Sequence, residues 1–217
     1  EEARQQAREV LADGSTGPVM RARFLELLAD AAWRAGDTRA ATSGYADVEL
    51  TPLDSARLRV VSVKRAIVGD PRREPVLGPY LMGAHGPAVE ADREVWLQET
   101  LDYLTDAVAD LPGDPLALYL LGRRLAMAQR FTEALGPLRT VAGVLDGDPG
   151  LPPSTVALLR DEVQRIEGVA LLQTGDATGA AACFEALASR ASWPGRALRF
   201  TEWAERALAG GALSLTP

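Results

Sequence analysis

Residues 115–148 read PLALYLLGRRLAMAQRFTEALGPLRTVAGVLDGD and carry the clearest fold signal in the chain. Apolar residues recur there every three or four positions, the spacing of an amphipathic helix, in two runs separated by Gln129-Arg130. Gly122 in the first run and Ala134 in the second are small enough to let two antiparallel helices approach closely. The stretch therefore predicts a helical hairpin with a tight turn at Gln129-Arg130, in which Gly122 and Ala134 face each other.

Two further stretches, 22–46 and 161–187, follow the same template. Each has a small residue, a Gly-Asp turn, a second small residue and then a large one. The positions are Ala29, Gly36-Asp37, Ala41 and Tyr45 in the first stretch, and Gly168, Gly175-Asp176, Ala180 and Phe184 in the second. The spacing of the turns predicts a further, degenerate turn near Gly83–Gly86.

Three Gly-Asp-Pro triplets, at 69–71, 113–115 and 147–149, have the residue order of a helix-to-helix junction. Glycine adopts the left-handed conformation that ends one helix, aspartate caps the next helix, and proline suits its first turn. The second and third triplets lie 34 residues apart, which is a known period of helical repeats. Because no alternating strand pattern accompanies these signals, the sequence predicts an all-helical chain.

The 34-residue period and the hairpin positions resemble those of the tetratricopeptide repeat (TPR) family. That family places Leu-Gly between bulky residues on its first helix, and Leu118, Leu121-Gly122 and Leu125 occupy those positions here. The resemblance implies an all-α fold: a right-handed α-solenoid of antiparallel helix pairs, with about eleven helices in a single domain over residues 1–217. HEAT-like repeats, with a period of ~40–47 residues, are the alternative. The small residue five positions after the turn glycine favours the TPR family.

The composition excludes several classes of partner. The net charge is −7 and the isoelectric point is near 4.9, so a surface for nucleic acid or for an anionic membrane is not expected. No apolar run reaches the ~18 residues of a membrane span. Lys64 is the only lysine among the 23 basic residues, an arginine bias typical of GC-rich bacterial genomes. The chain begins Glu1-Glu2-Ala3 without methionine, which suggests a piece of a longer protein or a processed form and favours the bacterial cell envelope over the cytoplasm.

The sequence offers little material for catalysis. His85 is the only histidine, in a Gly-Ala-His-Gly turn, which excludes multi-histidine metal sites and leaves one candidate for general acid–base work. Cys183 is the only cysteine, so no internal disulfide can form, and it lies on a predicted core face. Asp146 and Asp148 lack the third oxygen ligand and the later glutamate of a calcium loop. We therefore expect no catalytic residue, no cofactor and no metal site.

The family resemblance implies that the chain binds a protein or peptide on a concave surface lined by the first helix of each repeat. The matching positions are Arg23, Glu26, Asp30 and Trp33 in the first repeat, Tyr119, Arg123 and Met127 in the second, and Glu162, Arg165 and Val169 in the third. Tyr119 and Arg123 stand where some family members carry a lysine- and asparagine-based clamp for a terminal carboxylate, so that mode of binding is not expected. The resulting hypothesis is a scaffold or adaptor. The alternatives are an enzyme or small-ligand binder with a site in the solenoid groove, and a structural linker arm.

The tryptophans are expected in the helical core rather than on the binding surface, because large aromatic residues dominate such cores. All of them lie on or beside predicted helices: Trp33, Trp96, Trp193 and Trp203. Core packing is therefore expected for these four residues.

Overall fold

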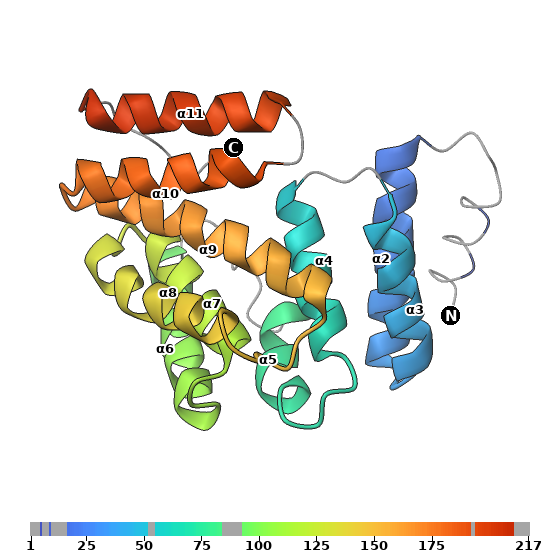
Figure 1. Cartoon of the computed structure of the whole chain (residues 1–217). Helices are drawn as coiled ribbons and strands as arrows, with labels where there is room; N and C mark the ends of the chain where they lie inside the picture. The colour runs from blue at the N-terminus through green and yellow to red at the C-terminus, as the bar shows by residue number, and fades with distance from the viewer. Residues whose placement is uncertain are drawn as a thin grey trace. The chain divides into compact units, whose positions relative to one another are not determined.

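The computed structural model describes residues 5, 9, 17–51, 55–83, 93–191 and 194–210. Over these residues the chain forms helices and no strand, which confirms the all-helical prediction (Figure 1). The ten helices of the described part are α2 (Pro18–Arg34), α3 (Thr38–Glu49), α4 (Ser55–Ile67), α5 (Glu74–Leu81), α6 (Arg93–Asp110), α7 (Pro115–Met127), α8 (Phe131–Leu145), α9 (Pro153–Gln173), α10 (Ala177–Arg190) and α11 (Pro194–Leu208). The chain divides into two compact units, residues 1–86 and 87–217.

Within each unit, helices that follow one another in the sequence pack together. In the first unit α2 packs on α3, α3 on α4 and α4 on α5; in the second, each helix from α6 to α11 packs on the next. Helix α10 lies between α9 and α11, and α7 also contacts α9 (Figure 1). Three of these contacts are the predicted hairpins: α2 with α3, α7 with α8 and α9 with α10.

The three hairpins share one turn geometry. In each hairpin the first helix ends in a C-cap residue, and the residue after it has a left-handed backbone. Its φ is 75° at Gly36, 61° at Gln129 and 92° at Gly175. The next residue donates its N–H to a carbonyl five positions back: Asp37 to Ala32 (3.0 Å), Arg130 to Leu125 (2.9 Å) and Asp176 to Leu171 (2.8 Å). This is the Schellman pattern that satisfies the last carbonyls of a helix. The predicted positions of all three turns are confirmed.

In each hairpin a glycine lies where the two helices are in close contact. A Cβ added to Gly122 would lie 2.8 Å from Leu138 Cγ, and one added to Gly168 would lie 2.8 Å from Phe184 Cε1. In the α2–α3 hairpin the glycine is on the second helix, where a Cβ on Gly44 would lie 2.9 Å from Ala29 Cβ. The predicted close contact is therefore present, but the atoms nearest to Gly122 belong to Leu138 rather than to Ala134.

Of the three Gly-Asp-Pro junctions, the one at 113–115 is confirmed and the one at 147–149 is wrong. The junction at 69–71 is confirmed only for its glycine, because α5 begins at Glu74, after the cap residue Arg73, rather than at Pro71. Gly69 and Gly113 have left-handed backbones, with φ of 80° and 73°. The carboxylate of Asp114 accepts the N–H groups of the first turn of α7, which begins at Pro115. At the third triplet, however, the left-handed residue is Gly150 and α9 begins only at Pro153. The reason is local: a proline disfavours helical backbone in the residue before it, so the two prolines at 152 and 153 delay the helix.

The described tryptophans lie against other aromatic side chains. Trp33 is buried and meets Tyr45 edge to face, with ring centroids 6.2 Å apart. Trp203 is half-buried, and its ring centroid lies 5.4 Å from that of Phe184 and 5.8 Å from that of Phe200. Core packing is thus confirmed for Trp33 and partly for Trp203. Trp193 and the side chain of Trp96 lie outside the described part of the chain.

Candidate binding surface

The inner face of α2 carries a buried ionic network. The Nζ of Lys64, on α4, lies 2.9 Å from Glu26 Oε1 and 2.9 Å from both carboxylate oxygens of Asp30. Arg57 of the same helix donates to Glu26 Oε2 at 2.6 Å, and the hydroxyl of Tyr45, on α3, donates to Asp30 Oδ1 at 2.6 Å. The side chains of Glu26 and Lys64 are only 2% and 7% exposed. Their charges are therefore balanced inside the unit rather than by water.

This network joins three helices and leaves no lysine donor for a ligand. An ammonium group has three donors, and three hydrogen bonds to Glu26 and Asp30 use them. Burial raises the pKa of Tyr45 far above its usual value, and the hydrogen bond to Asp30 raises it further. The phenol consequently stays protonated and donates. The arrangement supports a structural role, holding α2 in a fixed orientation on α3 and α4.

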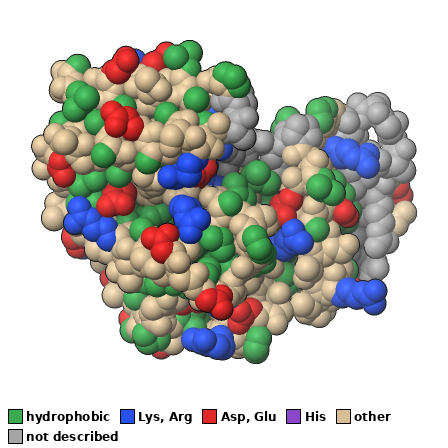
Figure 2. Space-filling view, viewed as in Figure 1, with side chains coloured by type: hydrophobic (Ala, Val, Ile, Leu, Met, Phe, Trp, Pro, Cys, Tyr) green, Lys and Arg blue, Asp and Glu red, His purple; other side chains and the backbone are tan. Residues whose placement is uncertain are grey.

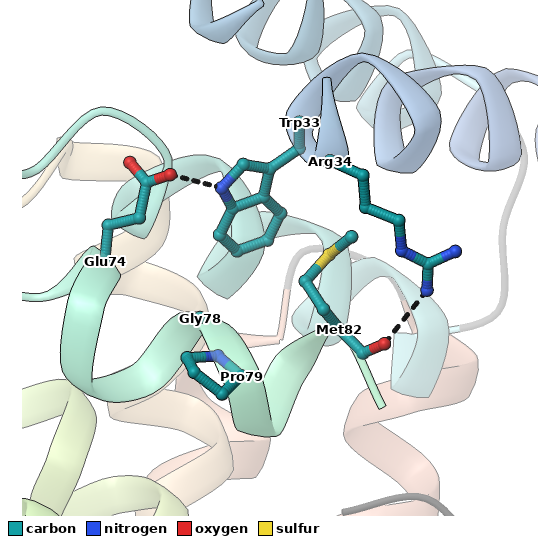
Figure 3. A pocket seen from close by; sticks show the side chains of 6 residues that line it. All are labelled: Trp33, Arg34, Glu74, Gly78, Pro79 and Met82. Carbon is teal, nitrogen blue, oxygen red and sulfur yellow. Dashed lines mark hydrogen bonds between the residues drawn. The ribbon is translucent and has the colours of Figure 1, made fainter. Parts of the chain in front are cut away.

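A shallow pocket of about 210 Å³ lies beside the C-terminal end of α2 (Figure 3). It is lined by Trp33, Arg34, Glu74, Gly78, Pro79 and Met82. The indole N–H of Trp33 donates to Glu74 Oε1 at 2.6 Å, and the backbone N–H of Gly69 donates to Glu74 Oε2 at 2.5 Å. On the opposite side the guanidinium of Arg34 donates to the carbonyl of Met82 at 3.0 Å.

The chemistry of the pocket favours an apolar group carried beside an anion. Both oxygens of Glu74 already accept hydrogen bonds, so this carboxylate is held in place. Arg34 is exposed, and a guanidinium has five donors, of which the bond to Met82 uses one. Small-molecule sites usually enclose ~300–1,000 Å³, so the smaller volume here suits a single side chain.

The outward face of α2, defined as Met20, Arg23, Phe24, Leu27 and Arg34, exposes large apolar side chains. Met20 is 50% exposed and Leu27 58%, with the half-buried ring of Phe24 between them. Their spacing of four and three residues puts them on one side of the helix, with the two arginines along the same side. Two large apolar side chains are therefore exposed on the same side of α2 as two cations.

The molecular surface elsewhere is of mixed character. In the view of Figure 2, acidic and basic side chains are interspersed with apolar ones over the described residues, without a continuous basic patch. Together with the net charge of −7, this face gives no support to binding of nucleic acid. None of the described helices is long and apolar enough to cross a membrane.

The second unit holds a smaller buried ion pair. Arg165 of α9 donates through Nε and Nη2 to the two carboxylate oxygens of Glu162, at 2.8 and 2.9 Å. This is the bidentate geometry in which arginine binds a carboxylate most firmly. Glu162 and Tyr119 are both buried. Burial of Arg165 lowers the pKa of its guanidinium, but the hydrogen bonds and charge of Glu162, helped by Tyr119, outweigh this effect and raise it.

The structure divides the sequence-predicted binding residues by exposure. Arg23 and Met127 are exposed; Asp30, Arg123 and Arg165 are half-buried; Glu26, Trp33, Tyr119, Glu162 and Val169 are buried. The expectation of an accessible surface is therefore wrong for the buried residues, because their side chains contact neighbouring helices or one another. The structure brings Glu26, Asp30 and Trp33 into one region of the first unit, and Tyr119, Glu162 and Arg165 into one region of the second. Partner binding by the exposed residues stays a prediction.

Several important side chains of the first unit escaped the sequence-based prediction: Arg34, Tyr45, Arg57, Lys64 and Glu74. One signal was available, since Lys64 is the only lysine in the chain and follows the apolar residue Val63 in a predicted helix. Its partners Glu26 and Asp30 were predicted to face solvent. They are 38 and 34 residues away in sequence, so helix periodicity could not connect them with Lys64.

The described residues show few groups suited to catalysis. No cluster of three or more His, Cys, Asp or Glu side chains among them could hold a metal ion. Cys183 is half-buried on α10, and burial raises the pKa of its thiol to about 11, so the thiol is protonated at neutral pH. His85, the predicted loop histidine, lies outside the described residues, as do the last three residues of the turn predicted at 83–86. Gly83 itself follows α5 with a left-handed backbone, φ 79°.

Comparisons of this chain with models of protein families, with curated proteins and with solved structures found no match. Functional inference therefore depends on the geometry described above.

Proposed function

We propose that the chain is a protein-binding adaptor whose first unit holds an amphipathic peptide or helix on the outward face of α2. The observation that carries this proposal is the exposure of Met20 and Leu27, 50% and 58%, beside Arg23 and Arg34. We further propose that the stacked hairpins belong to a right-handed solenoid, as the resemblance to TPR proteins implies. In this proposal the chain binds its partner and carries out no chemistry on it.

The surface indicates the chemistry of the partner. A helix that docks on another helix presents apolar side chains at positions i, i+3 or i+4, and i+7. Arg23 and Arg34 favour acidic residues along the edge of such a stripe. An apolar or aromatic side chain at the end of the partner would enter the pocket between Trp33 and Met82. The proposed partner is therefore an acidic, amphipathic segment.

The interior of the unit supports this role by holding α2 rigid. The ionic network of Lys64 with Glu26 and Asp30 ties the inner face of α2 to α4. The hydrogen bond between Trp33 and Glu74 ties its C-terminal end to α5. A surface that is already ordered loses less conformational entropy on binding, and affinity rises accordingly.

The test is a selection of helical peptides from a displayed library against the full chain, followed by affinity measurements on variants. Leu27→Glu should weaken the selected peptides by at least about tenfold, which is ~1.4 kcal/mol, because it places a carboxylate in the apolar stripe. Leu50→Glu is the matched control, since Leu50 is 86% exposed at the end of α3 and lies off the outward face. Equal effects of the two changes, or selected peptides without acidic and apolar residues at helical spacing, would overturn the proposal.

A further inference from the structure

Gly78 keeps the pocket beside the C-terminal end of α2 open on the side of α5. A Cβ added to this residue would lie 3.4 Å from Cζ2 of Trp33 and 3.7 Å from Cγ of Glu74. The added carbon would already touch the indole ring, so any larger side chain would enter the space beside it. Gly78 has a helical backbone inside α5, where alanine would be the better helix former. No backbone conformation therefore requires glycine here, and what the residue provides is room next to Trp33.

The walls around this space suit an aromatic ring. Trp33, Pro79 and Met82 present an indole ring, a proline ring and a thioether to the same pocket (Figure 3). Aromatic rings prefer offset or edge-to-face contacts with one another, and sulfur makes favourable contacts with ring edges. The indole ring is held in place by its hydrogen bond to Glu74 and by its edge-to-face contact with Tyr45. The pocket is therefore already shaped for a flat apolar group.

The size of the pocket suits one six-membered ring. An apolar cavity of ~150 Å³ is enough to hold benzene. The pocket here has about 210 Å³ and is bordered by the exposed residues Arg34 and Pro79, so a ring can enter from solvent while the backbone that carries it stays outside. The side chain of phenylalanine, a phenyl ring on one methylene group, fits these dimensions. An aliphatic side chain would fill the space without the contacts of a ring to the indole and the sulfur.

Arg34 places a positive charge at the rim of the pocket. Its guanidinium is exposed and is held by the carbonyl of Met82, to which it donates at 3.0 Å. An arginine positioned in this way can bind a carboxylate through two parallel hydrogen bonds. Glu74, the other charged group that lines the pocket, already accepts the N–H groups of Trp33 and Gly69 on its two oxygens. The rim therefore favours an anion beside the ring over a cation.

Arg34 also belongs to the outward face of α2 and so connects this face with the pocket. It lies seven residues after Leu27, which is about 10.5 Å along the helix. A partner helix that packs lengthwise on the outward face would place two of its side chains, seven residues apart, over Leu27 and at the pocket. A residue three or four positions from the second of these lies on the same side of the partner helix, within reach of Arg34.

We propose that this pocket is the specificity site of the proposed partner surface. It takes a phenylalanine side chain of the partner helix, seven residues from the apolar residue over Leu27. Arg34 binds an acidic side chain three or four positions from that phenylalanine, and Gly78 sets the selectivity by leaving space for the ring. The identity of the partner as a helix rests on the proposed function, whereas the ring site rests on the geometry of the pocket.

The peptides selected against the full chain test the selectivity. Replacing the phenylalanine of a selected peptide by alanine should weaken its binding to the unmodified chain at least about tenfold. Gly78→Leu should bind the parent peptide as weakly as the alanine peptide, so that the preference for phenylalanine disappears. The smaller change Gly78→Ala, which favours the helix, should reduce the preference severalfold, so the result does not depend on one variant.

Gly143→Leu is the matched control. It places the same side chain at an exposed helix position with nothing near the added Cβ, and it should keep the preference for phenylalanine. Selected peptides without phenylalanine at the predicted spacing, or a preference for phenylalanine that survives both changes at Gly78, would overturn the assignment.

Two small molecules test the ring site without any peptide. Hydrocinnamate carries a phenyl ring and a carboxylate, and phenethylamine carries the same ring with a cation. Titrated into the full chain with isotope-labelled tryptophan, hydrocinnamate should shift the indole N–H signal of Trp33, and phenethylamine should bind more weakly. Arg34→Gln should remove this difference, and Gly78→Leu should abolish the shift. An unresponsive Trp33 signal would overturn the ring site, and equal binding of the two molecules would overturn the role of Arg34.

The outcomes separate this inference from the proposed function. If hydrocinnamate binds in a Gly78-dependent manner but no peptide is selected against the chain, the ring site stands and the proposed function fails. If peptides bind in a Leu27-dependent manner but tolerate alanine in place of phenylalanine, the proposed function stands and the specificity site is wrong.

Discussion

At the scale of single residues, Lys64 has the most demanding environment in the first unit. Its ammonium group is buried between the buried carboxylate of Glu26 and the half-buried carboxylate of Asp30. Two anions and one cation leave a net negative charge, which Arg57 offsets from the half-exposed edge of the network. Each of these charges depends on the others, because an unpaired charge in this position has no access to water.

Lys64→Met should therefore lower the free energy of unfolding by about 3–5 kcal/mol, the usual effect of removing one partner from a buried ion pair. Arg57→Met is the matched control. Since the Arg57 side chain is 49% exposed, water can replace it, and the loss should be at most ~1 kcal/mol. Chemical denaturation of the two variants measures both values. A loss for Lys64→Met as small as that for Arg57→Met would show that the network contributes little.

At the scale of the helices, each hairpin depends on one position where the two backbones come close. Gly122 provides it between α7 and α8, and Gly168 between α9 and α10. The large partner side chains, Leu138 and Phe184, are fully buried over these glycines. In each contact a large side chain of one helix fills the space left by the glycine of the other. This fit fixes how the two helices align.

Gly122→Leu should destabilise the chain by roughly 1–3 kcal/mol, because the new side chain overlaps Leu138. The same change at Gly143, which is exposed on α8 with nothing near the added Cβ, is the matched control. Leucine there should be neutral or stabilising by up to ~1 kcal/mol, since it favours helix more than glycine does. Thermal or denaturant unfolding of both variants tests the sign as well as the size. A stabilising Gly122→Leu would mean that α7 and α8 do not meet at this residue.

At the scale of the whole molecule, the described helices belong to two compact units. The ionic network of Lys64 lies entirely within residues 1–86, and the Gly122–Leu138 contact lies within residues 87–217. Each unit has buried apolar residues of its own, such as Tyr45 in the first and Phe184 in the second. Units with separate cores can open separately.

Hydrogen exchange of the Lys64→Met and Gly122→Leu variants should show this independence. Lys64→Met should speed exchange in α2 to α5 and leave α6 to α11 unchanged, and Gly122→Leu should do the reverse. A uniform increase over all helices in either variant would show that the two units unfold as one.

The features that could be read from the sequence are those set by neighbours along the chain. Gly36 and Gly175 end their helices because glycine accepts the left-handed backbone, and Asp37 and Asp176 then cap the next helix through hydrogen bonds to Ala40 and Gly179. The delayed start of α9 is equally local. The prolines at 152 and 153, rather than the Gly-Asp-Pro triplet at 147–149, set where this helix begins.

The candidate site depended instead on contacts between residues far apart in sequence. Glu26 was expected on the accessible surface, and Trp33 was assigned both to that surface and to the core. Helix periodicity does not show which side of a helix a neighbouring helix will cover. Their partners Lys64 and Glu74 lie 38 and 41 residues away. The sequence by itself determined the helices, their turns and their close contacts, since backbone conformation and the nearest helix decide these. Only the tertiary structure decided which charges are buried together and which apolar face of α2 stays in water, since burial depends on every helix that packs around a residue.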